Sequence, residues 1–273
     1  FISHKLDEVL SVADDITVIR RGTTVRTVDP ASVTARQLAT LMVGSELPSP
    51  EARESTVTDE PVLTVTGLTV RGADGRPVVA DVSFTIHRGE VVGIAGVEGN
   101  GQAELVEAIM GMLPADGEIV LAGTALTGRS TRARREAGVG YIPADRHRHG
   151  LLLDAPLWEN RMLGHQTEAP NARGQLLTTG AARRDTARIV AAFDVRTPGI
   201  DVSAGALSGG NQQKLIIGRE MSHQPKVLLA AHPTRGVDVG AQAAIWDQIR
   251  AARRADTSAR SCWMRRAASP IAL

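Results

Sequence analysis

The feature of this sequence that most constrains its fold is a glycine-rich stretch between two apolar segments, residues 90–112. The segment EVVGIAG reads as a short apolar strand, and NGQAELVEAIMGM places Leu105, Val106, Ile109 and Met110 at helical spacing. A strand that runs through a glycine loop into a helix is the arrangement of a phosphate-binding loop. The sequence therefore predicts an α/β domain with this loop at the end of a strand.

The loop keeps the glycines of the pattern G-x-x-x-x-G-K-[ST] and lacks its two reactive side chains. Gln102 stands in place of the lysine that contacts the terminal phosphates, and Ala103 in place of the hydroxyl that binds Mg²⁺. Backbone N–H groups and the positive end of the following helix still attract phosphate. We expect residual nucleotide binding without efficient catalysis; the alternative is a tight glycine turn with no ligand. The candidate nucleotide-binding residues here are Gly96, Gly99, Asn100, Gly101, Gln102 and Ala103.

Composition limits the function classes. The chain has 273 residues and a formal charge of +1, a balance that gives no reason to expect a nucleic-acid partner. No apolar run approaches the roughly 20 residues that span a bilayer, so we expect any membrane role to come through a partner. A single cysteine, Cys262, cannot form an internal disulfide and fits a reducing compartment.

Residues 1–47 read as part of another α/β domain. The pattern predicts a short helix, two strands turned at Gly22, and a second helix closed by Gly44. Fewer than fifty such residues cannot bury enough surface to be stable alone, so we expect them to be the end of a larger domain. The alternative is a small N-terminal subdomain. Residues 48–61 are polar and proline-bearing, which predicts a linker.

A far more specific string is LSGGNQQKLIIGREM, residues 207–221. It matches the signature motif of ATP-binding cassette (ABC) proteins, in the LSGGNQQK form typical of sugar and nucleoside importers. Three further segments resemble parts of that family. The Walker B strand and D-loop resemble KVLLAAHPTRGVDVGA, and the Q-loop region resembles VGYIPADRHRHGL. The switch-histidine strand that ends a preceding cassette resembles FISHKLDEV. The HKLDEV and AAxPTRG segments resemble the nucleoside branch more than the sugar branch.

The resemblance covers nearly the whole chain and implies its fold and its domains. The implied fold is a P-loop NTPase-like ABC nucleotide-binding domain, a mixed sheet with helices and a helical subdomain, preceded by a fragment of a second such domain. Residues 1–47 would be the C-terminal fragment of a first cassette, 48–61 a linker, and 62–255 a second cassette with degenerate Walker A and B motifs.

The remaining residues, 256–273, depart from the family. Where the family continues with an apolar strand and a switch histidine, DTSARSCWMRRAASPIAL reads as neither, and we expect an aberrant tail like that of a GC-rich gene read in a shifted frame. The alternative is a basic tail that binds RNA or lipid. It has no interleaved aromatic residues and no amphipathic period to support it.

The resemblance also assigns site residues. Ser208, Gly209 and Gly210 offer a hydroxyl, close backbone approach and a helix N-terminus, which suit a γ-phosphate held by a partner cassette. His4 would be the switch histidine of the first cassette, a catalytic group at that same site. The expected signature contacts are Leu207, Ser208, Gly209, Gly210 and Gln212.

Several of the family's reactive positions are altered. The Walker B aspartate and glutamate, which hold Mg²⁺ and orient the attacking water, are replaced by Ala231 and His232. The Q-loop position reads Ala144, while Asp238 remains in the D-loop. The histidines of RHRHG, His147 and His149, have no cysteine partner and several neighbouring arginines. We therefore expect a solvated loop there and no metal site.

The function implied is that of an ATP-binding subunit fragment of an ABC transporter importing a sugar or nucleoside. We expect ATP as ligand, Mg²⁺ only at a site completed by a partner, and no ATPase activity from this chain alone. The implied partners are permease subunits, an extracellular solute-binding protein and another nucleotide-binding cassette, with the chain held by the permease at the cytoplasmic face of the plasma membrane. The alternative is a non-hydrolysing nucleotide-binding or regulatory remnant, or a pseudogene product.

Overall fold

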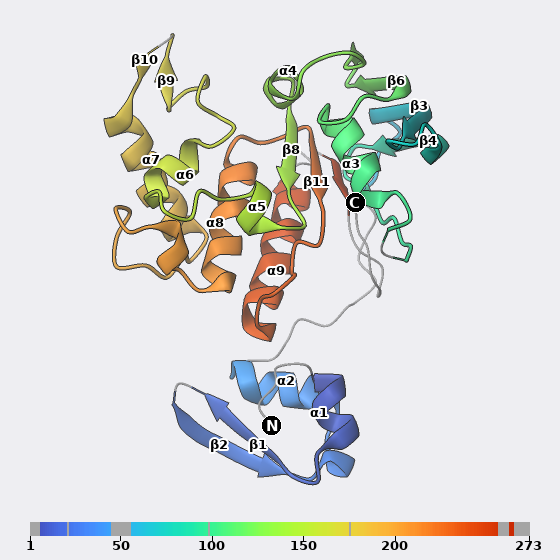
Figure 1. Cartoon of the computed structure of the whole chain (residues 1–273). Helices are drawn as coiled ribbons and strands as arrows, with labels where there is room; N and C mark the ends of the chain where they lie inside the picture. The colour runs from blue at the N-terminus through green and yellow to red at the C-terminus, as the bar shows by residue number, and fades with distance from the viewer. Residues whose placement is uncertain are drawn as a thin grey trace.

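The described residues form a small N-terminal unit and a larger α/β unit (Figure 1). The computed structural model describes residues 6–20, 22–44, 56–97, 99–174, 176–255 and 262–264. No helix in these ranges combines the length and the apolar character needed to cross a bilayer.

The N-terminal unit packs two helices on a two-stranded antiparallel sheet. Its elements are α1 (Leu6–Val12), β1 (Ile16–Arg20), β2 (Thr23–Val28), the 3-10 helix η1 (Pro30–Ser32) and α2 (Ala35–Val43). Thr34 and Gln37 form a capping box at the start of α2, and Gly44 ends it in the left-handed conformation at φ +85°. The predicted order of helix, hairpin and helix is confirmed. A small core of Ile16, Val18, Val28 and Leu38 holds the unit together.

A parallel sheet in the order β5-β12-β11-β8 forms the centre of the larger unit. Its strands are β5 (Val91–Val92), β8 (Val139–Ile142), β11 (Val227–Ala230) and β12 (Cys262–Met264). Side chains alternate between the two faces of a strand. On β11, Val227 and Leu229 therefore join the core around α3 (Gln102–Met110), whereas Leu228 and Ala230 join the core around α8 (Gly209–Ser222) and α9 (Val239–Ala255). The sheet thus separates α3 from α8.

An antiparallel sheet in the order β4-β3-β6-β7 completes the core on the α3 side. Its strands are β3 (Pro61–Arg71), β4 (Pro77–His87), β6 (Asp116–Leu121) and β7 (Thr124–Ala125). The predicted strands VLTVTGLTV and PVVADVSFTI are confirmed as β3 and β4, and the helix after the glycine loop as α3. β3 begins at the last residue of the predicted linker.

Helices gather on the other side, around α8 (Figure 1). They are α5 (Arg146–His149), α6 (Leu157–Met162) and α7 (Thr179–Ala192), with two short strands and a 3-10 helix, β9 (Ala172–Arg173), β10 (Leu176–Leu177) and η2 (Ala204–Ala206). α4 (Thr131–Glu136) contacts α3 and β8 instead. The helix predicted from AARRDTARIVAAF is confirmed as α7, which contacts α6 and α8. The predicted α/β architecture with a helical subdomain is confirmed.

The expectation that residues 256–273 contain no apolar strand was wrong. β12 lies between β11 and β5, with Cys262 opposite Val227 and Trp263 opposite both Leu228 and Val91. Three residues can form a strand here because the two neighbouring strands supply its hydrogen-bond partners. So short an apolar run, flanked by arginines, gives no periodic signal. Residues 256–261 and 265–273 lie outside the described residues.

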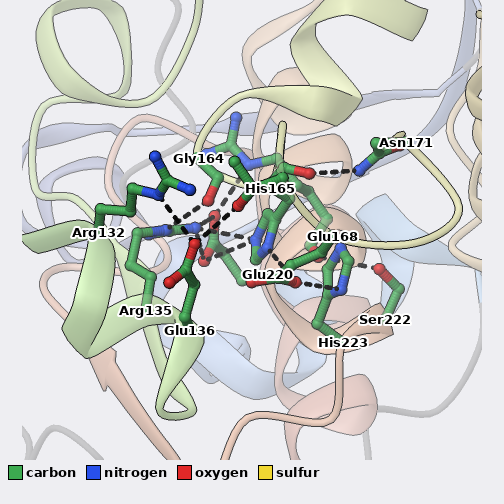
Figure 2. Close-up of polar contacts among 12 residues, drawn as sticks. Arg132, Arg135, Glu136, Gly164, His165, Glu168, Asn171, Glu220, Ser222 and His223 are labelled. Carbon is green, nitrogen blue, oxygen red and sulfur yellow. Dashed lines mark hydrogen bonds and ion pairs between the residues drawn. The ribbon is translucent and has the colours of Figure 1, made fainter. Parts of the chain in front are cut away.

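Glu220, in the last turn of α8, joins this helix to the central sheet. Its Oε2 accepts hydrogen bonds from the backbone N–H of Tyr141 on β8 at 3.1 Å and from Arg135 Nη2 at 2.8 Å (Figure 2). Arg219 Nε donates to Oε1 at 2.8 Å. Burial raises the pKa of Glu220, but Arg135 and Arg219 outweigh that effect and hold it well below its usual range. The carboxylate therefore stays charged and fully paired.

We predict that Glu220→Gln lowers the free energy of unfolding by about 3–5 kcal/mol, because it leaves two arginines around a neutral group in the interior. Urea denaturation of the chain measures it. Glu136→Gln is the matched control, since Glu136 pairs with Arg132 at the surface and should change stability by at most about 1 kcal/mol. Equal effects of the two substitutions would contradict the anchoring role of Glu220.

Candidate functional site

The glycine loop leads from β5 into α3, as the sequence predicts. Gly99 and Gly101 have φ values of +92° and +94°, in the left-handed region that favours glycine. A Cβ at Gly101 would lie 2.5 Å from the carbonyl oxygen of Val78, so the backbone of β4 excludes any side chain there. The loop geometry therefore needs its glycines, independently of the missing lysine. Glu98, within the loop, lies outside the described residues.

Gln102 is buried and folds back over the loop that precedes it. Its Oε1 accepts a hydrogen bond from the backbone N–H of Asn100 at 3.1 Å, and its Nε2 donates to the carbonyl oxygen of Val97 at 3.0 Å. The orientation of the amide follows from its partners, because Asn100 offers a donor and Val97 an acceptor. Ala103, the position of the family's hydroxyl, is exposed on the first turn of α3.

The positions that should hold Mg²⁺ and the attacking water lie just beyond β11. The N–H of Ala231 donates to the carbonyl oxygen of Ile142 on the neighbouring strand, and His232 follows with φ +47°. Ala144 comes two residues after β8, the strand parallel to β11, so its methyl group belongs to the same sheet edge. Mg²⁺ is bound through oxygen ligands, which the side chains of Ala144, Ala231 and His232 do not provide.

The signature motif begins α8. Ser208 is the N-cap residue, and its Oγ accepts a hydrogen bond from Asn211 Nδ2 at 3.0 Å. A Cβ at Gly209 would lie 2.8 Å from the carbonyl oxygen of Gly236, and one at Gly210 would lie 3.0 Å from the Cβ of Ala241. Close packing against the segment before α9 therefore excludes a side chain at Gly209, and Gly210 packs tightly against the start of α9.

Arg146, which the sequence did not single out, joins three parts of this region. From α5 its Nε donates to Gln212 Oε1 at 3.0 Å, and its Nη1 donates to the carbonyl oxygen of Arg235 at 2.8 Å. Gln212 Nε2 in turn donates to the carbonyl oxygen of Ala204 at 3.1 Å. Arg146 thus ties the Q-loop side of the molecule to the signature helix and to the D-loop segment. Its partners lie far along the chain, so no local pattern marks it.

The other predicted residues take the following places. Leu207 is buried in the core around α8, and Asp238 caps α9 by accepting the N–H of Ala241 at 2.8 Å. His147 and His149 are exposed on α5, so they lie on a short helix and not in the predicted loop. His147 Nε2 is 2.9 Å from Gln212 Oε1, a contact that the sequence did not predict. His4 lies outside the described residues.

A cavity of about 490 Å³ adjoins the signature. Ser208, Asn211 and Lys214 line it from the larger unit, and Arg20 and Met42 from the N-terminal unit. Figure 1 shows the N-terminal unit beside one end of α9, and α2 contacts that helix. Both units therefore contribute to the surroundings of the signature.

His165, Glu168 and His223 bring ligand types of a zinc site within 4.8 Å of one another (Figure 2). Both Nδ1 atoms face Glu168 Oε2, at 3.2 and 3.0 Å, and the imidazole rings stack with centroids 3.8 Å apart and planes 8° apart. Arg135 Nη2 lies 2.9 Å from His165 Nε2 and can only donate, so the proton of neutral His165 is on Nδ1 and points at Glu168. The three residues therefore form a hydrogen-bonded cluster.

Comparison with known proteins identifies the family. A sequence profile described as "ABC transporter" matches residues 79–235, more than half of the chain. The chain belongs to the ABC transporter family. Guanosine import ATP-binding protein NupO of Bacillus subtilis is 43% identical over 231 residues, which cover 84% of this chain and 45% of NupO. Nucleoside import ATP-binding protein NupA of Lactococcus lactis is 41% identical over 241 residues, covering 88% of this chain and 48% of NupA.

Further relatives and a solved structure support the same family. Ribose import ATP-binding protein RbsA 1 of Streptomyces avermitilis is 40% identical over 250 residues, covering 91% of this chain and 46% of that protein. The chain thus spans about half the length of the curated relatives it matches. A dimeric structure of MJ0796, a bacterial ABC transporter cassette, has a TM-score of 0.62 at 20% identity and covers 74% of this chain and 87% of that chain. This likeness confirms the predicted cassette fold.

We predict that Arg146→Ala lowers the free energy of unfolding of this cassette by about 1.5–3 kcal/mol, because the guanidinium forms hydrogen bonds to two separate segments, α8 and residues 235–236. It should also speed amide hydrogen exchange at residues 235–238. The neighbouring Arg148, whose side chain is exposed, supplies the control: Arg148→Ala should change stability by no more than about 0.5 kcal/mol. Unchanged exchange at 235–238 in Arg146→Ala would disprove the link.

Proposed function

We propose that this chain is part of the ATP-binding subunit of an ABC importer for a sugar or a nucleoside. Import ATP-binding proteins are among its relatives at 40–43% identity, and two of them are named for guanosine or nucleoside import. The observation that carries the proposal is the signature. Ser208 begins α8 with its Oγ oriented by Asn211, and the glycines that follow fit closely against α9.

In this proposal the signature serves an ATP site whose phosphate-binding lysine belongs to another cassette. The N-terminus of α8 carries a partial positive charge and unpaired N–H groups, which favour a γ-phosphate. Mg²⁺ would be bound at that partner-completed site. The chain's own loop has Gln102 and Ala103 in place of the reactive groups, and Ala231 and His232 follow β11, so this second site would hold a nucleotide without cleaving it.

The domain arrangement follows the same reasoning. Residues 1–47 are proposed as the C-terminal part of a first cassette, 48–61 as the linker and 62–255 as a degenerate second cassette. Residues 256–273 are proposed as an aberrant tail, of which Cys262–Met264 supplies β12 to the cassette's central sheet. The cavity shared by Arg20 and Ser208 supports a first-cassette segment close to the signature. His4 would then contribute the switch histidine. We further propose permease subunits and an extracellular solute-binding protein as partners, with the chain at the cytoplasmic face of the membrane.

A non-hydrolysing regulatory remnant is the second candidate. The side chains at Ala231 and His232, which remove the Mg²⁺ ligand and the water-orienting group, favour it. The upstream DNA distinguishes the two candidates. An intact first cassette in frame, beside permease genes, supports the transport subunit, whereas an isolated coding fragment supports the remnant.

For catalysis, we predict that the purified chain releases no phosphate from ATP above background, with or without Mg²⁺. The missing lysine, hydroxyl, aspartate and glutamate act as a unit, so restoring any single one, such as Gln102→Lys, should not rescue activity. A colorimetric phosphate assay measures it. Magnesium-dependent turnover by the unmodified chain would contradict the prediction.

For the partner-completed site, we predict that Ser208→Arg in the full-length subunit reduces ATP turnover by at least about 100-fold, because it removes the hydroxyl and fills the space used by the γ-phosphate. The control is Thr85→Arg, which places the same side chain on the exposed face of β4 and should leave turnover within about twofold. If Ser208→Arg retained turnover at the level of the control, the proposed role of the signature would be refuted.

A further inference from the structure

The side chain of Gln102 occupies part of the candidate phosphate-binding loop. In such loops the backbone N–H groups and the helix N-terminus are the atoms that bind phosphate oxygens. Here the N–H of Asn100 is shared between Gln102 Oε1 at 3.1 Å and the carbonyl oxygen of Val97 at 3.2 Å. Gln102 is only 9% exposed although it is the first residue of α3. A side-chain oxygen thus takes a donor of the kind that a phosphate oxygen would use.

The Gln102 amide also takes up space at the base of the loop. A Cβ on Gly96 would lie 2.2 Å from Gln102 Nε2, so the amide packs directly against the backbone of the first glycine of the motif. The same Nε2 donates to the carbonyl oxygen of Val97 at 3.0 Å. Two hydrogen bonds and this contact hold the side chain across residues 96–100. An incoming phosphate has to displace it.

We propose that Gln102 is an internal plug of this loop, and that its side chain competes with the polyphosphate of a nucleotide for the N–H of Asn100 and for the space beside Gly96. The inference rests on the proposed function, since it takes the ligand of the loop to be a nucleotide. This proposal gives the residue that replaces the lysine an effect of its own on nucleotide binding. Gln102 does not simply fail to attract the phosphates; it lowers the affinity of the loop for them and restricts this site to high nucleotide concentration or to the closed cassette pair.

If Gln102 blocks the loop, removing its side chain should strengthen the binding of a nucleotide there. Two neutral hydrogen bonds of ordinary strength correspond to about a tenfold change in affinity. Gln102→Ala takes the side-chain oxygen away from the N–H of Asn100, whose remaining acceptor is the carbonyl oxygen of Val97 at 3.2 Å, and clears the space beside Gly96. The backbone is unchanged, so we expect about tenfold tighter binding. Gln102→Glu keeps an oxygen near the same N–H and adds a negative charge, so we expect binding weaker than that of the unmodified chain.

The experiment is a fluorescence titration of the chain with an N-methylanthraniloyl derivative of ATP, and with inorganic tripolyphosphate as competitor. Gln242→Ala, an exposed change on α9, is the control and should match the unmodified chain. Thermal melting of each variant verifies that it is folded. The expected order of affinity is Gln102→Ala, then unmodified, then Gln102→Glu.

The order of the variants separates a plug from a general loosening of the loop. Loosening weakens binding in both Gln102→Ala and Gln102→Glu. The proposal is overturned if Gln102→Ala binds no more tightly than the unmodified chain, including the case in which neither binds. The proposed function is tested separately, by ATP turnover of the full-length subunit with Ser208→Arg. If the Gln102 titration contradicts the plug, the turnover measurement still decides the proposed function.

Discussion

The buried carboxylate of Glu220 is the interaction on which the rest of this cassette depends. It sits at the C-terminal end of α8, the helix whose N-terminal end carries Ser208, and it holds α8 against β8 through the N–H of Tyr141. Without Glu220, Arg135 and Arg219 would be buried beside a strand with no opposing charge. The position of the signature therefore follows from an ion network at the opposite end of its helix.

The central sheet divides the candidate chemistry into two unequal parts. On one side the glycine loop leads into α3 and is closed by Gln102, and the residues after β11 lack carboxylates. On the other side α8 begins with the signature, which Arg146 links to the segment before α9. The altered positions thus lie in the glycine loop and after β8 and β11. The signature, which we propose serves a partner's nucleotide, is held in place by hydrogen bonds and close packing.

The sequence predicted those parts whose determinants are local. Strand, glycine loop and α3 follow from periodicity and from glycines that need positive φ, and the signature is a contiguous string. The sequence did not predict the contacts of Gln102 or Arg146, since these contacts depend on how the folded backbone places the partner atoms. β12 was missed for a related reason, because three residues become a strand when two neighbouring strands supply hydrogen bonds. His147 was expected in a loop, yet the side chain of Asp145 accepts its N–H and begins a helical turn.

The central claim is that a subunit containing this cassette has one site competent for ATP cleavage, completed by Ser208, and one that is not. The most direct measurement is the number of nucleotides trapped per full-length subunit by orthovanadate during turnover. Trapping requires a site that cleaves ATP, so the account predicts one trapped nucleotide per subunit, in contact with the signature peptide that contains Ser208. Two trapped nucleotides per subunit, or one bound at the loop that contains Gln102, would contradict it.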